Sequence, residues 1–77
     1  MKIRRVSPGP TYTIEGITAE DMQALAHVVW NVGGDPEKSY RRSFDKFFKV
    51  VREAGFTGSS EYTKGTSIYF TDGGVNV

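Results

Sequence analysis

The basic residues of this 77-residue chain gather in one segment. Positions 38 to 52 hold six basic side chains and one acidic one, Asp45, so six minus one gives this segment +5, whereas the whole chain carries +1. The six are Lys38, Arg41, Arg42, Lys46, Lys49 and Arg52. The aromatic residues of the same segment recur at helical spacing, so the pattern predicts a helix that is aromatic inside and basic outside. Such a face could bind an anion: a nucleic acid, a nucleotide or an acidic protein surface.

Two further observations bear on this basic face. Lys and Arg are also good helix formers, so a merely solvated helix face has the same composition. The pI of the chain, ≈ 8.0, is below the value of about 9 that is typical of dedicated nucleic-acid-binding domains. Trp30 is expected at the border of the first helix's apolar stripe and Tyr40 in the stripe of the second helix, and Tyr, Trp and Arg are enriched among the residues that dominate binding energy at interfaces. We therefore include these two aromatic residues as flanking anchors of the candidate binding face.

The sequence contains few residues that could form a catalytic site. There is no cysteine, which excludes a disulfide framework, a thiolate zinc site and a cysteine nucleophile. The one histidine, His27, has no neighbouring nucleophile motif and is expected on the exposed face of a helix. Gly33-Gly34 lacks the Lys-Ser/Thr ending of a phosphate-binding loop. We expect a protein that is not an enzyme and that uses no metal or cofactor.

Local patterns predict the elements that would position the basic face. Residues 2–6 and 11–17 are expected strands, the second with period-two alternation. Thr18 is placed to cap a helix that ends at Gly33-Gly34. Asp35, as N-cap before Pro36, predicts a second helix that Gly55 closes. A terminal hairpin is expected between Tyr62 and residues 68–70, with Lys64-Gly65 at its turn.

These elements predict an α+β fold in the order β-β-α-α-β-β, or β-α-α-β-β if residues 2–6 are not a strand. Since each helix has one apolar stripe and the strands have one apolar face, we expect two layers, with a helical hairpin lying on a small antiparallel β-sheet. The length allows one domain, residues 1–77. So short a chain buries a small core, and we expect it to gain stability by association as a homodimer or with another partner. The sequence holds no membrane span or signal peptide, and the absence of cysteine favours a cytoplasmic protein.

The segment from Ile14 to Gly55 resembles short proteins encoded by tailed phages. The similarity lies in a strand, a helix with the acidic start Ala19-Glu20-Asp21 and a Val-Gly-Gly end, and a second helix that ends near Ala-Gly. A terminal strand at residues 66–70 is also similar. The resemblance implies an accessory protein that acts by binding inside an infected bacterium, as inhibitors of host factors and of defence systems such as CRISPR do. It assigns no catalytic residues.

The residues and the resemblance together predict a small, non-enzymatic phage-type binding protein. It would inhibit a host or defence-system protein by occupying an acidic surface of that partner. Two alternatives remain open at this point. One is a DNA- or RNA-binding module like a winged helix-turn-helix, with the basic second helix in the groove. The other is a sponge that sequesters a nucleotide signal.

Overall fold

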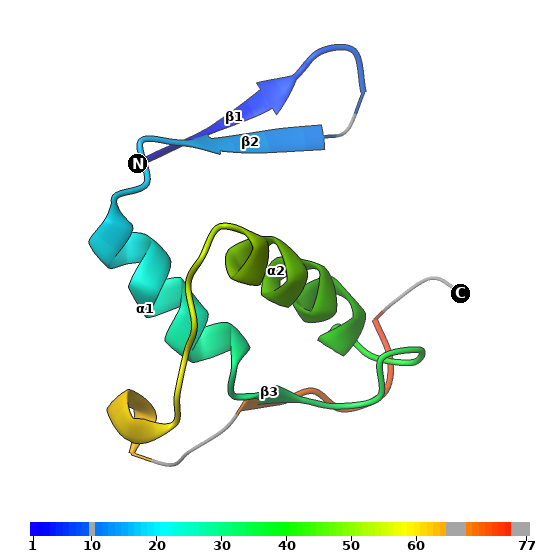
Figure 1. Cartoon of the computed structure of the whole chain (residues 1–77). Helices are drawn as coiled ribbons and strands as arrows, with labels where there is room; N and C mark the ends of the chain where they lie inside the picture. Colours follow the sequence, from blue (N-terminus) through cyan, green and yellow to red (C-terminus); the bar gives the residue numbers. More distant parts are fainter. Residues whose placement is uncertain (10, 65–67, 75–77) are drawn as a thin grey trace.

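A computed structural model of the chain describes residues 1–9, 11–64 and 68–74 (Figure 1). It has the α+β composition expected from the sequence, with a small antiparallel sheet and two helices. In chain order the elements are β1 (Lys2–Val6), β2 (Thr11–Glu15), α1 (Ala19–Val29), β3 (Val32–Gly33), α2 (Arg41–Glu53), the 3-10 helix η1 (Glu61–Thr63) and β4 (Ile68–Tyr69).

Strands β1 and β2 form the antiparallel hairpin that the period-two pattern predicts. Its register places Ile3 opposite Ile14 and Arg5 opposite Tyr12. Because side chains alternate along a strand, these four residues share one face of the hairpin. Every residue of both strands is exposed, and Figure 1 shows the hairpin standing apart from the pair of helices. The expected layer of helices packed on this sheet is therefore only partly formed.

Helix α1 begins as the sequence predicts. The hydroxyl of Thr18 accepts a hydrogen bond from the backbone N–H of Asp21 (3.1 Å), which satisfies one of the unpaired donors of the first turn. The helix ends earlier than expected, at Val29, with Trp30 as its C-cap. The expected end at Gly33-Gly34 is wrong because Val32 and Gly33 leave the helix and form strand β3.

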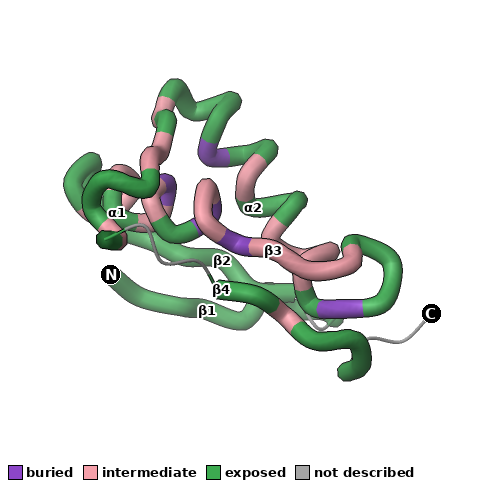
Figure 2. Tube along the Cα trace, turned by 90° about the horizontal axis from the view of Figure 1, so that it is seen from below, coloured by how far each residue is buried: buried purple, intermediate pink, exposed green. Residues whose placement is uncertain are grey.

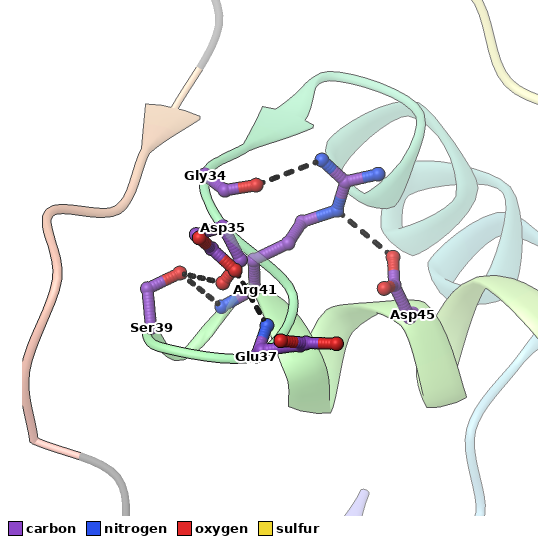
Figure 3. Close-up of polar contacts among 6 residues, drawn as sticks. All are labelled: Gly34, Asp35, Glu37, Ser39, Arg41 and Asp45. Atoms are coloured by element: carbon purple, nitrogen blue, oxygen red, sulfur yellow. Dashed lines mark hydrogen bonds and ion pairs between the residues drawn. The ribbon is translucent and has the colours of Figure 1, made fainter.

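The start of α2 also differs from the expectation. Asp35 is not its N-cap, since the helix begins at Arg41. The Asp35 carboxylate instead accepts the N–H of Glu37 (2.8 Å), and its carbonyl group accepts the hydroxyl of Ser39 (2.7 Å). These bonds close a separate turn before the helix (Figure 3). The completely buried Ser39 then accepts the N–H of Arg41 (3.2 Å), so it takes over part of the capping role.

The C-terminus of α2 has the geometry that Gly55 and Phe56 predict. Gly55 has a φ of 93°, and its N–H donates to the carbonyl of Arg52 (3.0 Å). The N–H of Phe56 donates to the carbonyl of Val51 (3.2 Å). The two bonds make a Schellman motif, and the Phe56 side chain packs against the core.

The expected terminal hairpin is wrong. Tyr62 lies in η1, and β4 pairs in parallel with β3, with Val32 opposite Ile68. Lys64 has a φ of 55° and ends η1. Residues 65–67, which include the rest of the expected turn, lie outside the described residues. The C-terminal segment therefore returns to the loop between the helices instead of folding back on residue 62.

The core lies between the two helices. Ala26 and Val29 of α1 form a buried cluster with Val51 of α2, and Figure 2 shows buried segments in both helices. Larger, partly buried side chains surround them: Met22, Leu25, Trp30, Phe44, Phe48 and Phe56. The fully buried part of the core thus consists of small residues, and much of the large apolar surface is covered only in part.

A candidate binding face on the second helix

Helix α2 separates apolar and basic side chains as the sequence predicts. Phe44, Phe48 and Val51 are turned toward α1 and contact the core. Lys46 and Lys49 lie on the far side of the helix and are exposed. Among the described residues, neither lysine takes part in an ion pair. These two side chains are the most accessible part of the predicted basic face.

The two arginines at the start of α2 are engaged within the chain. Arg41 is half-buried; its Nε donates to the Asp45 carboxylate (2.8 Å), and its Nη1 donates to the carbonyl of Gly34 (3.4 Å) (Figure 3). Arg42 is also half-buried and donates from Nη2 to the carbonyl of Glu37 (2.7 Å). Both guanidinium groups hold the turn before α2 against the helix, so less of their charge is available to a ligand.

The remaining basic residues lie at the two ends of the segment. Lys38 is exposed but belongs to the turn, so it does not lie on α2 as expected. Arg52 is exposed on the last turn, with its guanidinium carbon 5.8 Å from the centre of the Phe48 ring. Glu53 adds a carboxylate to the same helix, so the charge of the face is less one-sided than residues 38–52 alone indicate.

The two flanking aromatic residues have different environments. Trp30 is half-buried and stacks on Phe48, with the ring centres 4.1 Å apart. Tyr40 is exposed at the start of α2, with its ring centre 6.1 Å from that of Phe70. Tyr40 is therefore accessible to a partner, whereas Trp30 mainly closes the margin of the core.

Exposed apolar residues of α2 were missed as site residues in the sequence. Phe47 belongs to the apolar stripe expected in the core, yet it is exposed, and so is Val50. They line a groove of about 450 Å³ between α2, α1 and the hairpin. The other lining residues are Tyr12, Ile14, Ile17, Met22, Leu25, Phe44 and Val51. Periodicity identifies an apolar stripe but not how much of it a neighbouring element covers.

His27 is not the exposed side chain that the sequence predicts. It is half-buried, and its Nδ1 accepts the backbone N–H of Ser59 (3.2 Å). Its ring lies 4.7 Å from that of Tyr62. With Glu20, Gln23 and Ala24, these two residues line a shallow, open hollow. The bond to Ser59 gives His27 a structural role in fixing the segment after α2.

The described part of the chain has neither a cluster of metal-ligating side chains nor a helix that could span a membrane. No group of three or more His, Cys, Asp or Glu side chains in the described residues could hold a metal ion. Neither helix within those residues has the length and apolar character needed to cross a membrane. In comparisons with known proteins, no protein family, curated protein or solved structure matches this chain.

Proposed function

We propose that this chain is a small, non-enzymatic protein that acts by binding. Its target would be a host or defence-system protein in the cytoplasm of an infected bacterium, and it would inhibit that protein by occupying an acidic surface. The resemblance to short tailed-phage proteins supports this setting. It also supports a target that is either a host factor or a component of a defence system such as CRISPR. The binding mode is supported by the surface of α2.

The main support for the proposal is the exposed surface of α2 around Lys46 and Val50. Lys46 is one helical turn before Val50 and both side chains are exposed, so a positive and an apolar group share one surface of the helix. Interfaces between proteins combine apolar contact with a charged rim in this way. The phosphate backbone of a duplex offers no apolar contact to Phe47 and Val50. The mixture therefore favours an acidic protein surface over a double-stranded nucleic acid.

The winged helix-turn-helix alternative is weakened by the segment after α2. A wing would need an antiparallel hairpin there, but the described residues form η1 and a strand that pairs in parallel with β3. The basic helix remains able to contact phosphates. The nucleic-acid and nucleotide alternatives are therefore carried as outcomes of the experiment.

The experiment captures ligands of the tagged protein from the lysate of phage-infected bacteria, with and without nuclease, and identifies both proteins and small molecules. The proposal expects one protein partner that survives nuclease treatment and whose purified activity falls when this chain is added in equal amount. Recovery of nuclease-sensitive material alone, or of a nucleotide alone, contradicts the proposal. An affinity that falls linearly with salt on a log–log plot would identify a nucleic-acid binder.

Charge reversals test whether α2 makes the contact. Lys46→Glu and Lys49→Glu should each weaken binding of the captured partner by about tenfold, which is about 1.4 kcal/mol. Lys64→Glu makes the same change of charge at an exposed position outside α2 and should leave the affinity unchanged. Isothermal titration gives the three affinities, and circular dichroism checks that each variant is folded. Equal effects of all three substitutions would exclude α2 as the contact surface.

A further inference from the structure

The hairpin β1–β2 has an apolar face that the described chain covers poorly. Ile3, Tyr12 and Ile14 share this face, and all are exposed. A two-stranded hairpin in water is marginally stable unless further strands or a helix cover it. The groove that separates Tyr12 and Ile14 from Phe47 of α2 leaves that cover incomplete. A second copy of the chain would supply the missing cover, and it is present whenever the chain folds.

The outer edge of β2 is suited to pairing with itself. Among the described residues, β2 pairs with β1 alone, so its other edge has free backbone groups. If two copies of β2 pair antiparallel about Thr13, then Tyr12 lies opposite Ile14 of the second copy, and Thr11 lies opposite Glu15. The apolar side chains then meet on one face, and no like charges oppose each other.

The outer edge of β1 is unsuited to the same pairing. Lys2, Arg4 and Arg5 give this five-residue strand three positive charges. Two copies of β1 side by side would bring those charges together, which destabilises cross-strand pairs. Strand β2 carries a single charge, that of Glu15, at its end. The charge distribution thus selects β2 over β1 as the self-pairing edge.

We propose that the chain forms a two-fold symmetric homodimer in which the two copies of β2 pair antiparallel about Thr13, giving the sheet order β1-β2-β2′-β1′. Because the two-fold axis is then perpendicular to the sheet, the apolar faces of both hairpins lie on the same side. Both α2 helices lie on the same side of the sheet as that face. The dimer completes the two-layer packing that a single copy leaves open.

The exposed apolar area is sufficient for such an interface. Between 52% and 72% of the surface remains exposed for each of four large apolar residues at the hairpin. They are Met1, Ile3, Tyr12 and Ile14. If a large side chain has a full surface of ~200 Å², these fractions leave roughly 500 Å² per copy. A standard interface buries about 800 Å² per partner, so the apolar part of the hairpin alone supplies more than half of it.

Sedimentation equilibrium of the whole chain measures its mass in solution. We expect a mass of twice 8.6 kDa. A mass of 8.6 kDa at every concentration overturns the proposal. Since the chain has no cysteine, a single introduced thiol then reports the register. Thr13→Cys places two thiols across the axis, with Cβ atoms about 5 Å apart, and should form a disulfide-linked dimer rapidly on mild oxidation.

Thr11→Cys is the matched control on the same face of the same strand. In the proposed pairing, position 11 of one copy lies opposite position 15 of the other. The two copies of position 11 are therefore offset by four residues along the strands, and their thiols would be roughly 14 Å apart. This variant should crosslink at least tenfold more slowly than Thr13→Cys. Equal rates, or a faster rate for Thr11→Cys, overturn the proposed register and with it the dimer.

Two lysine substitutions test the pairing without oxidation. Thr13→Lys places like charges opposite each other at the axis and should shift the mass toward that of a single chain. Thr11→Lys places the same new charge opposite Glu15 of the second copy and should keep the dimer. Circular dichroism confirms that both variants are folded. If the two variants have the same mass, the proposal is wrong, and this comparison remains decisive if Thr13→Cys does not fold.

Discussion

Gly58 passes so close to the first helix that it leaves no room for a side chain. A Cβ atom at this position would meet the backbone carbonyl group of Ala26 and would lie 2.9 Å from the Cβ of Trp30. Carbonyl groups in a helix cannot move without breaking its hydrogen bonds. The segment after α2 is therefore held against α1 by the absence of a side chain as well as by the bond from Ser59 to His27.

We expect Gly58→Ala to lower the free energy of unfolding by about 1–3 kcal/mol because the added methyl group forces the segment away from α1. Urea unfolding at a fixed protein concentration measures this change as a lower midpoint. Ser60→Ala, in the same loop, is the control, since no side-chain capping bond is made by Ser60; its effect should stay within about 0.5 kcal/mol. Equal midpoints for Gly58→Ala and the natural chain would contradict the close packing.

His27 shows why residue environments are hard to predict from sequence. Its position on the helical wheel is polar, which predicts exposure, yet the N–H that it accepts comes from Ser59, 32 positions along the chain. The wheel records only neighbours within the helix. A loop residue that folds over the helix produces no periodic pattern in the helix sequence. The contact between Ser59 and His27 could therefore not be predicted from the sequence.

At the scale of single elements, Ser39 takes over part of the capping role that the sequence predicts for Asp35. Both residues make hydrogen bonds in the turn before α2, but only Ser39 accepts the N–H of Arg41 at the start of the helix. Its hydroxyl also donates to the carbonyl of Asp35 (2.7 Å), so one buried atom joins the turn to the helix. The burial of Ser39 makes both bonds important, since a buried polar group without a partner is costly.

We expect Ser39→Ala to destabilise the chain by about 1–2 kcal/mol because it removes the acceptor of the Arg41 N–H and the donor to the Asp35 carbonyl. Ser43→Ala changes the same side chain within α2, where Ala is a good helix former, and should change stability by less than about 0.5 kcal/mol. Thermal unfolding followed by circular dichroism measures both. If both variants unfold together with the natural chain, then the Ser39 hydroxyl does not stabilise the start of α2.

Elements with local signals were predicted correctly, and elements made by distant pairing were not. The Thr18 cap, the Gly55 Schellman motif and the β1–β2 hairpin each depend on residues close together in the sequence. The parallel pair β3–β4 joins residues 32–33 to residues 68–69, and two-residue strands carry no readable alternation. The candidate site followed the same rule: the basic and aromatic sides of α2 were predictable, whereas the exposure of Phe47 and Val50 depends on where the hairpin lies.

For the whole molecule, Phe70 connects the C-terminal segment to α2. Its ring lies 5.4 Å from that of Phe44 and 6.1 Å from that of Tyr40, measured between centres. Its N–H donates to the carbonyl of Gly33 (3.0 Å), which extends the pairing of β4 with β3. One residue thus joins the second sheet to the aromatic side of α2.

We expect Phe70→Ala to lower the melting temperature by roughly 6–24 °C, since losing a partly buried aromatic ring costs about 1.5–3 kcal/mol. For a domain of this size, 1 kcal/mol corresponds to about 4–8 °C. The neighbouring Tyr69→Ala removes a ring that is 75% exposed and should have a clearly smaller effect. Differential scanning calorimetry at one protein concentration compares the two variants. A larger loss for Tyr69→Ala would mean that the C-terminal segment is not anchored through Phe70.

The pairing of β3 with β4 also has a consequence for synthesis on the ribosome. The hairpin, α1 and α2 are complete once residue 53 has been translated, but β3 has no strand beside it until residues 68 and 69 follow. Closing a long loop costs more entropy than closing a short one, so this pairing comes after the local contacts. During that interval the nascent chain holds its helices while Phe44 and Tyr40 have not yet met Phe70. The emerging chain therefore passes through a stage in which more of its aromatic surface is exposed than in the finished fold.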